Sequence, residues 1–207
     1  MKIGIFGGTF DPIRNGHLAI AEMVADIKEL DEVWIVPNGN PPHRDAVASA
    51  RDRYHMVQES VRGNPRLKVS NEETFGKGPR YTVDLVRSFR KRHPSDEIFL
   101  IIGFDEWEGF EGWRAPSVIR SIVDDIIVVY PNESEGPIGI ALTGRGAEGV
   151  QSVCLRGIRD EHSSTIRSLM RKRISCRYLI PEPAWSIIRE RGLYRGLKGG
   201  APSEGSS

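Results

Sequence analysis

Short apolar runs recur along the chain, with amphipathic segments between them. Each run is bounded by glycine, proline or polar residues, which is typical of buried strands. The runs cover residues 2–6, 32–36, 67–69, 97–102, 125–129 and 150–155. The segments between them place apolar residues at helical spacing, as Leu18, Ala21 and Val24 do. The pattern predicts helices over about 16–30, 50–61, 83–93, 164–172 and 184–191.

The alternation of strands and helices predicts an α/β fold: a Rossmann-like, doubly wound parallel sheet with helices on both faces. A chain of 207 residues suits one well-buried domain, which we place at residues 1–195, followed by a flexible tail at 196–207. The glycine-rich segment 133–149 lacks periodicity and is expected to be a loop. Such a sheet binds ligands beyond the carboxyl ends of its strands, so functional loops should follow strands one, two, four and six.

Polar residues at the expected helix starts suggest caps: Ser49, Thr82, and either Ser163 or Ser164. The net charge of +1 gives no basic field for nucleic acid. No apolar run has the length of a membrane span or a signal peptide, so we expect a cytoplasmic protein without a membrane partner. The two cysteines form no CxxC pair, and we expect no metal site built from protein ligands. A homo-oligomer remains open.

The most informative segment is GGTFDPIRNGH at residues 7–17, which follows a strand and opens a helix. Glycines there let the backbone approach a ligand closely. The unpaired N–H groups of a helix start favour a phosphate group. His17 falls in the first helical turn, where its ring can reach that phosphate.

This segment is similar to the nucleotidyltransferase superfamily signature GGTFDPxHxGH. The resemblance implies that His17 stabilises charge on the α-phosphate of ATP. It also implies ATP contacts from Gly8, Thr9, Phe10 and Gly16.

One position departs from the signature, because Arg14 stands where the family has a histidine. Arginine can donate two hydrogen bonds to phosphate and is permanently charged, but it is longer than an imidazole. Two readings remain open: Arg14 takes a related catalytic role at the phosphates, or the site is weakened.

Three further segments resemble nicotinate mononucleotide adenylyltransferases. The first is PNGNPPHR at 37–44, which is similar to PN-x-x-PPH-[KR]. The second is RYTVDL at 80–85, which is similar to SYT-x-x-TL. The third is IGFD at 102–105 with a tryptophan eight residues later, which is similar to IGxD-x7-W. The resemblance implies a mononucleotide site built from Asn38, His43, Arg44, Thr82, Asp105 and Trp113. Two positions depart: Leu85 replaces a threonine, and Tyr130 stands where many relatives have arginine.

Residues 162–167, HSSTIR, resemble the second superfamily signature, ISSTxIR. The resemblance implies that Ser164, Thr165 and Arg167 hold the β- and γ-phosphates of ATP. The closing segments at 178–181 and 193–195 resemble the family's LVP and LYR, so the likeness runs from about residue 2 to 195.

The resemblance implies an enzyme of NAD biosynthesis that transfers AMP from ATP to nicotinate mononucleotide, forming deamido-NAD and pyrophosphate. It implies Mg²⁺ bound mainly through the ATP phosphates. Two alternatives stay open. The acceptor could be nicotinamide mononucleotide or phosphopantetheine, or the change at Arg14 could mark a homologue that binds nucleotide without turnover. An oxidoreductase is disfavoured, because the first loop is not GxGxxG.

Overall fold

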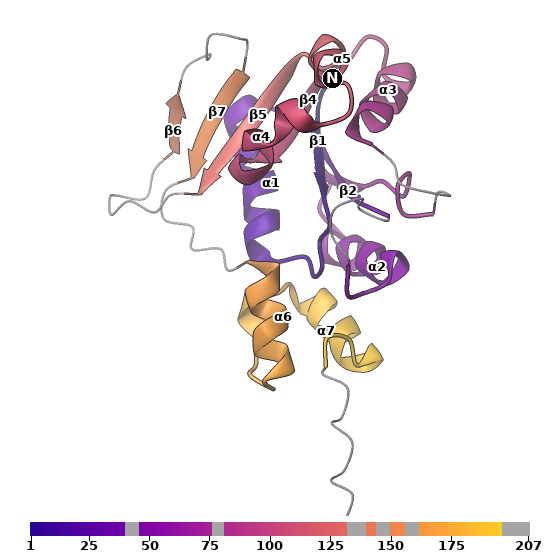
Figure 1. Ribbon diagram of the computed structural model, residues 1–207, viewed down its shortest axis with the longest axis vertical. Helices are drawn as coiled ribbons and strands as arrows, with labels where there is room; N and C mark the ends of the chain where they lie inside the picture. Colours follow the sequence, from indigo (N-terminus) through magenta and orange to yellow (C-terminus); the bar gives the residue numbers. More distant parts are fainter. Residues whose placement is uncertain (40–45, 76–80, 132–139, 144–149, 156–161, 196–207) are drawn as a thin grey trace, which may run out of the picture.

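The structure is a computed structural model that describes residues 1–39, 46–75, 81–131, 140–143, 150–155 and 162–195 (Figure 1). Its centre is a seven-stranded sheet in the order β3-β2-β1-β4-β5-β7-β6. The strands are β1 (Lys2–Gly8), β2 (Glu32–Pro37), β3 (Leu67–Val69), β4 (Glu97–Gly103), β5 (Asp125–Pro131), β6 (Ile140–Thr143) and β7 (Val150–Leu155). All neighbours pair parallel except β6 and β7. The predicted doubly wound α/β fold is confirmed.

Helices connect the strands. The α-helices are α1 (Asn15–Lys28), α2 (Ala50–Ser60), α3 (Thr82–Arg92), α4 (Phe104–Glu108), α5 (Pro116–Ile122), α6 (Ser163–Arg171) and α7 (Glu182–Arg191). Two short 3₁₀ helices lie at Phe110–Gly112 and Arg177–Leu179. In Figure 1, α6 and α7 lie together at the lower end of the molecule, below the start of α1.

The sheet separates two apolar cores, because successive strand side chains point to opposite faces. On β1, Ile3 and Ile5 pack into the core that α3 and α5 cover. Phe6 points the other way, into the core shared with α1, α2, α6 and α7. Both faces are therefore buried, which explains why the parallel strands are almost continuously apolar.

One of the predicted caps is confirmed. The Ser49 hydroxyl accepts a hydrogen bond from the Asp52 N–H at 3.1 Å and starts α2. The other caps were wrong by one position. Thr82 is the first residue of α3, after an extended Tyr81 whose side chain makes no capping bond. Ser163 is likewise the first residue of α6, after His162.

The segment expected to be a loop, 133–149, contains strand β6. This strand pairs antiparallel with β7, from Ile140 opposite Leu155 to Thr143 opposite Ser152. A strand of four residues is too short to show a period, and its partner lies further along the chain. The predicted tail at 196–207 lies outside the described residues.

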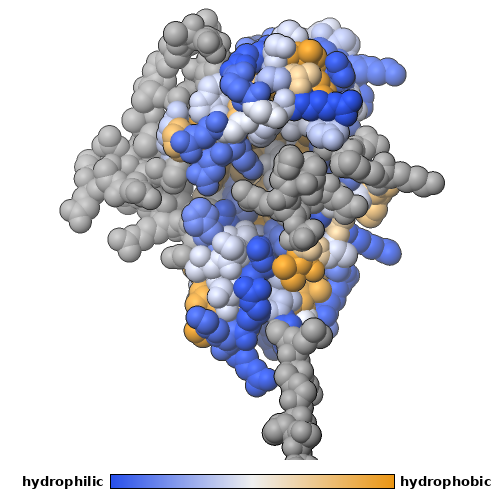
Figure 2. Space-filling model, in the orientation of Figure 1, coloured by the Kyte–Doolittle hydropathy of each residue, from blue (hydrophilic) through white to orange (hydrophobic). Residues whose placement is uncertain are grey.

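No helix in the described part of the chain is both long and apolar enough to cross a bilayer. On the face drawn in Figure 2, apolar residues occur in separate groups among hydrophilic ones. Single exposed apolar side chains of this kind are normal on protein surfaces.

Candidate active site

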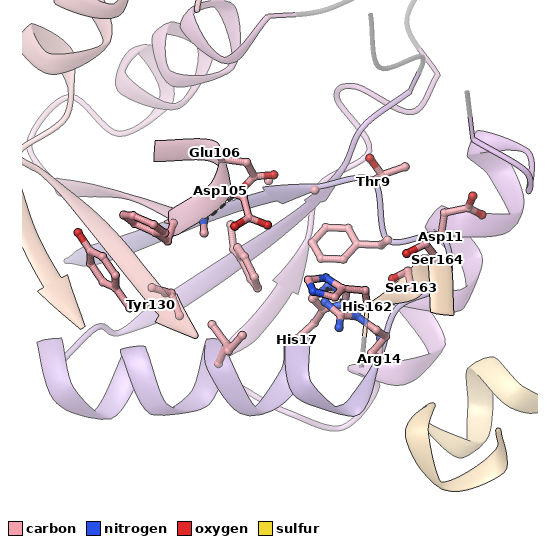
Figure 3. A pocket seen from close by; sticks show the side chains of 18 of the residues that line it. Thr9, Asp11, Arg14, His17, Asp105, Glu106, Tyr130, His162, Ser163 and Ser164 are labelled. Carbon is pink, nitrogen blue, oxygen red and sulfur yellow. Dashed lines mark hydrogen bonds between the residues drawn. The ribbon is translucent and has the colours of Figure 1, made fainter. Parts of the chain in front are cut away.

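A pocket of about 360 Å³ opens at the carboxyl ends of β1, β4 and β5. It lies where the strand order reverses, since β1 is flanked by β2 on one side and by β4 on the other. Open α/β sheets bind ligands at this switch point. Three segments supply most of the lining: the loop after β1, the start of α4 and the start of α6 (Figure 3).

The loop after β1 begins beyond Gly8, the last residue of the strand, and turns at Phe10. A Cβ on Gly8 would lie 2.9 Å from the Phe10 ring, so only glycine lets that ring fold back over the strand. Phe10 has a left-handed backbone (φ 46°) and is 3% exposed. Its ring meets the ring of His17 edge-on at 5.0 Å. The loop thereby buries one apolar side chain while Gly8, Thr9 and Phe10 line the pocket.

His17 and Arg14 lie against each other at one end of the pocket (Figure 3). The backbone N–H of Arg14 donates to His17 Nδ1 at 3.2 Å, and the guanidinium Nη2 of Arg14 lies 2.7 Å from His17 Nε2. A guanidinium has donors only, and an imidazolium has no acceptor. The neutral ring has only one accepting nitrogen. If Nδ1 accepts from the Arg14 N–H, Nε2 carries the ring proton, and its contact with the guanidinium is a close approach of two donors and not a hydrogen bond. Burial, and then the positive charge of Arg14, hold the pKa of His17 well below its usual value.

We expect an NMR pH titration of the His17 ring in the free protein to give a pKa well below 6.5. Replacing Arg14 by methionine removes the nearby positive charge but leaves the ring buried. The pKa of His17 should therefore rise in Arg14→Met yet stay below the ordinary histidine value, because burial remains. A pKa near 6.5 in the unmodified chain would contradict this account.

The start of α6 is fastened to the loop after β1. The Ser163 hydroxyl donates to the Pro12 carbonyl at 3.1 Å, and Arg167 Nη1 donates to the Asp11 carbonyl at 2.7 Å. Arg167 Nε is buried and has no hydrogen-bond partner within the described residues. Ser164 and Arg167 line the pocket, so the two signature segments meet as the resemblance implies.

The opposite side of the pocket is formed by the start of α4 and the end of β5. Glu106 accepts a hydrogen bond from the Gly103 N–H at 3.1 Å, which fixes the first turn of α4. Asp105 is exposed and faces the pocket (Figure 3). Tyr130 lies with its ring 4.6 Å from that of Phe104. This side was predicted only in part, because Glu106 and Phe104 carry no recognisable motif.

Several predicted residues lie elsewhere. Gly16 lies within α1 and the exposed Thr165 within α6, and neither lines the pocket. The Asn38 N–H donates to the Gly8 carbonyl at 2.9 Å, so the segment after β2 borders the first loop. His43 and Arg44 lie outside the described residues.

Thr82 and Trp113 belong to a second group, beside the core under α3 and α5. Trp113 and Trp107 both pack on Phe110. The ring centroid of each tryptophan lies 5.2 Å from that of Phe110. The Arg114 guanidinium lies 4.6 Å from the ring centre of Tyr81, which joins the Trp113 segment to the start of α3. The segments that carry Thr82 and Trp113 therefore meet through Arg114 and Tyr81, and neither predicted residue lines the pocket.

Asp11 is a site residue whose role the sequence reasoning missed. It is 2% exposed and accepts hydrogen bonds from the Val47 N–H at 2.7 Å, the Ala48 N–H at 3.1 Å and the Tyr194 hydroxyl at 2.7 Å. The signature contains Asp11, but its partners lie far along the chain. Nothing local indicates that its carboxylate holds the first loop in place.

Comparisons with known proteins identify the family of the chain. The family model described as cytidylyltransferase-like matches residues 5–179. The chain therefore belongs to the cytidylyltransferase-like family of nucleotidyltransferases.

Similar proteins identify the group within this family to which the chain belongs. The chain is 36% identical over 201 residues to a probable nicotinate-nucleotide adenylyltransferase of Geobacillus kaustophilus, covering 96% of this chain and 88% of the relative. It is 34% identical over 197 residues to a protein of the same description from Salinibacter ruber, covering 94% and 98%. Within its family, the chain belongs with the nicotinate-nucleotide adenylyltransferases.

Solved structures support the fold. The nicotinic acid mononucleotide adenylyltransferase of Plasmodium falciparum, complexed with NaAD, superposes with a TM-score of 0.74 at 15% identity, covering 93% of this chain and 97% of that one. The same enzyme complexed with APC gives a TM-score of 0.71 at 16% identity, covering 93% and 96%.

Proposed function

We propose that this chain transfers AMP from ATP to nicotinate mononucleotide, forming deamido-NAD and pyrophosphate. The observation that carries the proposal is the convergence of His17, the loop after β1 and the start of α6 on one pocket. A neutral donor, backbone N–H groups and the Arg167 guanidinium suit a polyphosphate. The family membership and the named relatives point to the same reaction.

In this reaction a phosphate oxygen of the mononucleotide attacks the α-phosphorus of ATP. The bond from that phosphorus to the oxygen bridging to the β-phosphate breaks, and pyrophosphate leaves with the bonding electrons. The attacking phosphate is already ionised near pH 7, so no general base is required. Catalysis then consists of positioning and of stabilising charge on the transferred group.

We propose the following roles, which the family resemblance implies and which the placement of most of these residues supports. His17 stabilises the α-phosphate, and Arg14 leaves the His17 ring to contact a neighbouring phosphate. Ser164 and Arg167 hold the β- and γ-phosphates at the start of α6. Asp105 contacts the mononucleotide from the far side of the pocket. Thr82 and Trp113 extend the acceptor site beyond it.

We also propose that Mg²⁺ enters bound to ATP. Among the described residues no three His, Cys, Asp or Glu side chains form a group that could hold a metal ion. Mg²⁺ retains water and phosphate oxygens as ligands, so it requires no such group. When bound, it neutralises charge on the phosphates that leave.

The test is pyrophosphate release from ATP with Mg²⁺ and one of three acceptors: nicotinate mononucleotide, nicotinamide mononucleotide or phosphopantetheine. We expect turnover that is fastest with nicotinate mononucleotide. Arg14→His is assayed in parallel, because it restores the signature residue. Turnover only in Arg14→His would identify Arg14 as an impairing change, and no turnover in either chain with any acceptor would refute the proposed reaction.

A further inference from the structure

Helix α2 buries a cation. Arg53 is 1% exposed and shares its helix face with Met56 and Val57, which are both 0% exposed. Burying a charged side chain is costly unless hydrogen bonds satisfy it. An apolar residue of similar volume commonly serves packing equally well at such a position. Packing alone therefore does not account for an arginine here.

Within the described part of the chain, the hydrogen bonds of the Arg53 guanidinium all go to backbone carbonyls. Nη1 donates to Thr9 O at 2.7 Å and to Asn38 O at 2.6 Å. Nη2 donates to Gly39 O at 2.6 Å, and Nε donates to Ala48 O at 3.3 Å. Thr9 belongs to the loop after β1, whereas Asn38 and Gly39 belong to the segment after β2. One rigid, planar group therefore spans both segments.

The segment after β2 is held from its other side as well. A Cβ on Gly39 would lie 2.1 Å from the carbonyl oxygen of Glu73, so the two backbones are pressed together. The Thr74 hydroxyl donates to Pro37 O at 3.3 Å. Residues 37–39 are thus clamped between Arg53 and residues 73–74, and their position depends on both.

We propose that Arg53 is a positioning residue that fixes the ATP-binding loop at Thr9 relative to the start of the acceptor-binding segment at Asn38. This inference rests on the proposed function and on the family resemblance, which implies ATP contacts for the first segment and mononucleotide contacts for the second. Arg53 contacts neither substrate and acts through the carbonyls that it holds. If the hydrogen bonds of the guanidinium are lost, each segment stays attached to its own strand, so each substrate still binds. The two reacting atoms, however, lose their relative placement.

The first test is Arg53→Lys. Lysine keeps a positive charge but lacks the planar guanidinium that bonds to Thr9, Asn38 and Gly39 together. A misplacement of about 1 Å lowers turnover by about 10²-fold. We expect kcat to fall by about that factor, while the KM values for ATP and for the mononucleotide change far less. Arg51→Lys is the matched control, because Arg51 lies on the exposed face of α2, and its kinetics should be unchanged.

Thermal unfolding of each variant separates positioning from stability. If Arg53→Lys has a lower melting temperature but an unchanged kcat per folded molecule, the role is structural and the proposal is overturned. If both KM values rise in proportion to the loss in kcat, the segments serve binding separately, and the proposal is again overturned.

Hydrogen exchange tests the same inference without turnover. In Arg53→Lys we expect faster exchange in peptides covering residues 8–12 and 36–39 together, with unchanged exchange in β4. Faster exchange in only one of the two peptides would overturn the proposal. If the unmodified chain makes no pyrophosphate, the proposed function fails, while this exchange result still decides whether Arg53 links the two segments.

Gly39→Ala reaches the same link from the other side. Its new Cβ would collide with the Glu73 carbonyl oxygen, and the backbone shift that relieves the collision would move the Gly39 carbonyl out of its bonding position at Arg53. We expect the same loss of kcat and the same faster exchange, so this variant decides the matter if Arg53→Lys does not fold. Unaltered kinetics in a folded Gly39→Ala chain would count against the proposal.

Discussion

His17→Ala should lower kcat by about 10²- to 10³-fold, as expected when one preorganised group that stabilises transition-state charge is removed. The ring lies in the pocket and is held by Phe10 on one side and by Arg14 on the other. The KM for ATP should change much less, because Ser164, Arg167 and the loop after β1 remain. Steady-state pyrophosphate release measures both constants.

Two further variants sharpen this experiment. His17→Gln keeps an N–H donor near the place of Nε2, so it should retain more activity than His17→Ala. His55→Ala is the matched control, because His55 lies on α2 and does not line the pocket. Removing the ring also removes the acceptor for the Arg14 N–H, which costs about 1 kcal/mol of stability. Equal turnover in His17→Ala and His55→Ala would remove His17 from the mechanism.

The elements that the sequence predicted well are those with a strong local signal. Residues 98–102 form an uninterrupted apolar run because β4 is buried on both faces. Helix α4, with five residues, and helix α5, with seven, were missed. Both are too short to show a helical period. At Tyr81, the cap was misplaced because the helix starts without any side-chain capping bond.

The site residues likewise divide into those that a local motif indicated and those that it did not. Five residues of one continuous motif were predicted together and all line the pocket: Gly8, Thr9, Phe10, Arg14 and His17. Arg53 was not predicted, because its partners are backbone carbonyls, and a carbonyl has no sequence signature. Trp113 is the reverse case: a motif singled it out, and the structure packs it on Phe110 away from the pocket lining.

Asp11 shows how the distant parts of the chain fix the first loop. Its carboxylate holds Val47 and Ala48, and it accepts from Tyr194, which lies 183 residues away. Burial, and then the nearby Asp11, raise the pKa of the Tyr194 hydroxyl, so that hydroxyl remains a donor. Arg167 donates to the Asp11 carbonyl, so the arginine that we propose for phosphate binding depends on the same residue.

Asp11→Ala should therefore lower the free energy of unfolding by about 3–5 kcal/mol. It leaves the Val47 N–H, the Ala48 N–H and the Tyr194 hydroxyl without their acceptor, and it removes the carboxylate that lies 3.8 Å from Arg167 Nη1. The expected loss is a large share of the roughly 5–15 kcal/mol that stabilises a domain. Urea unfolding measures the change. Asp11→Asn is the matched control. Its amide keeps one accepting oxygen but turns an N–H₂ group toward either Tyr194 or Val47, so its loss should be smaller.

A double-mutant cycle then isolates the contact between Asp11 and Tyr194. Tyr194→Phe alone should cost about 1.5–3 kcal/mol, as expected for a hydrogen bond to a charged group. Because the two side chains share that bond, the loss in Asp11→Ala combined with Tyr194→Phe should be smaller than the sum of the single losses. Strict additivity would mean that Tyr194 is held by packing alone. A lowered kcat in folded Tyr194→Phe would show that the end of the chain positions the first loop for catalysis.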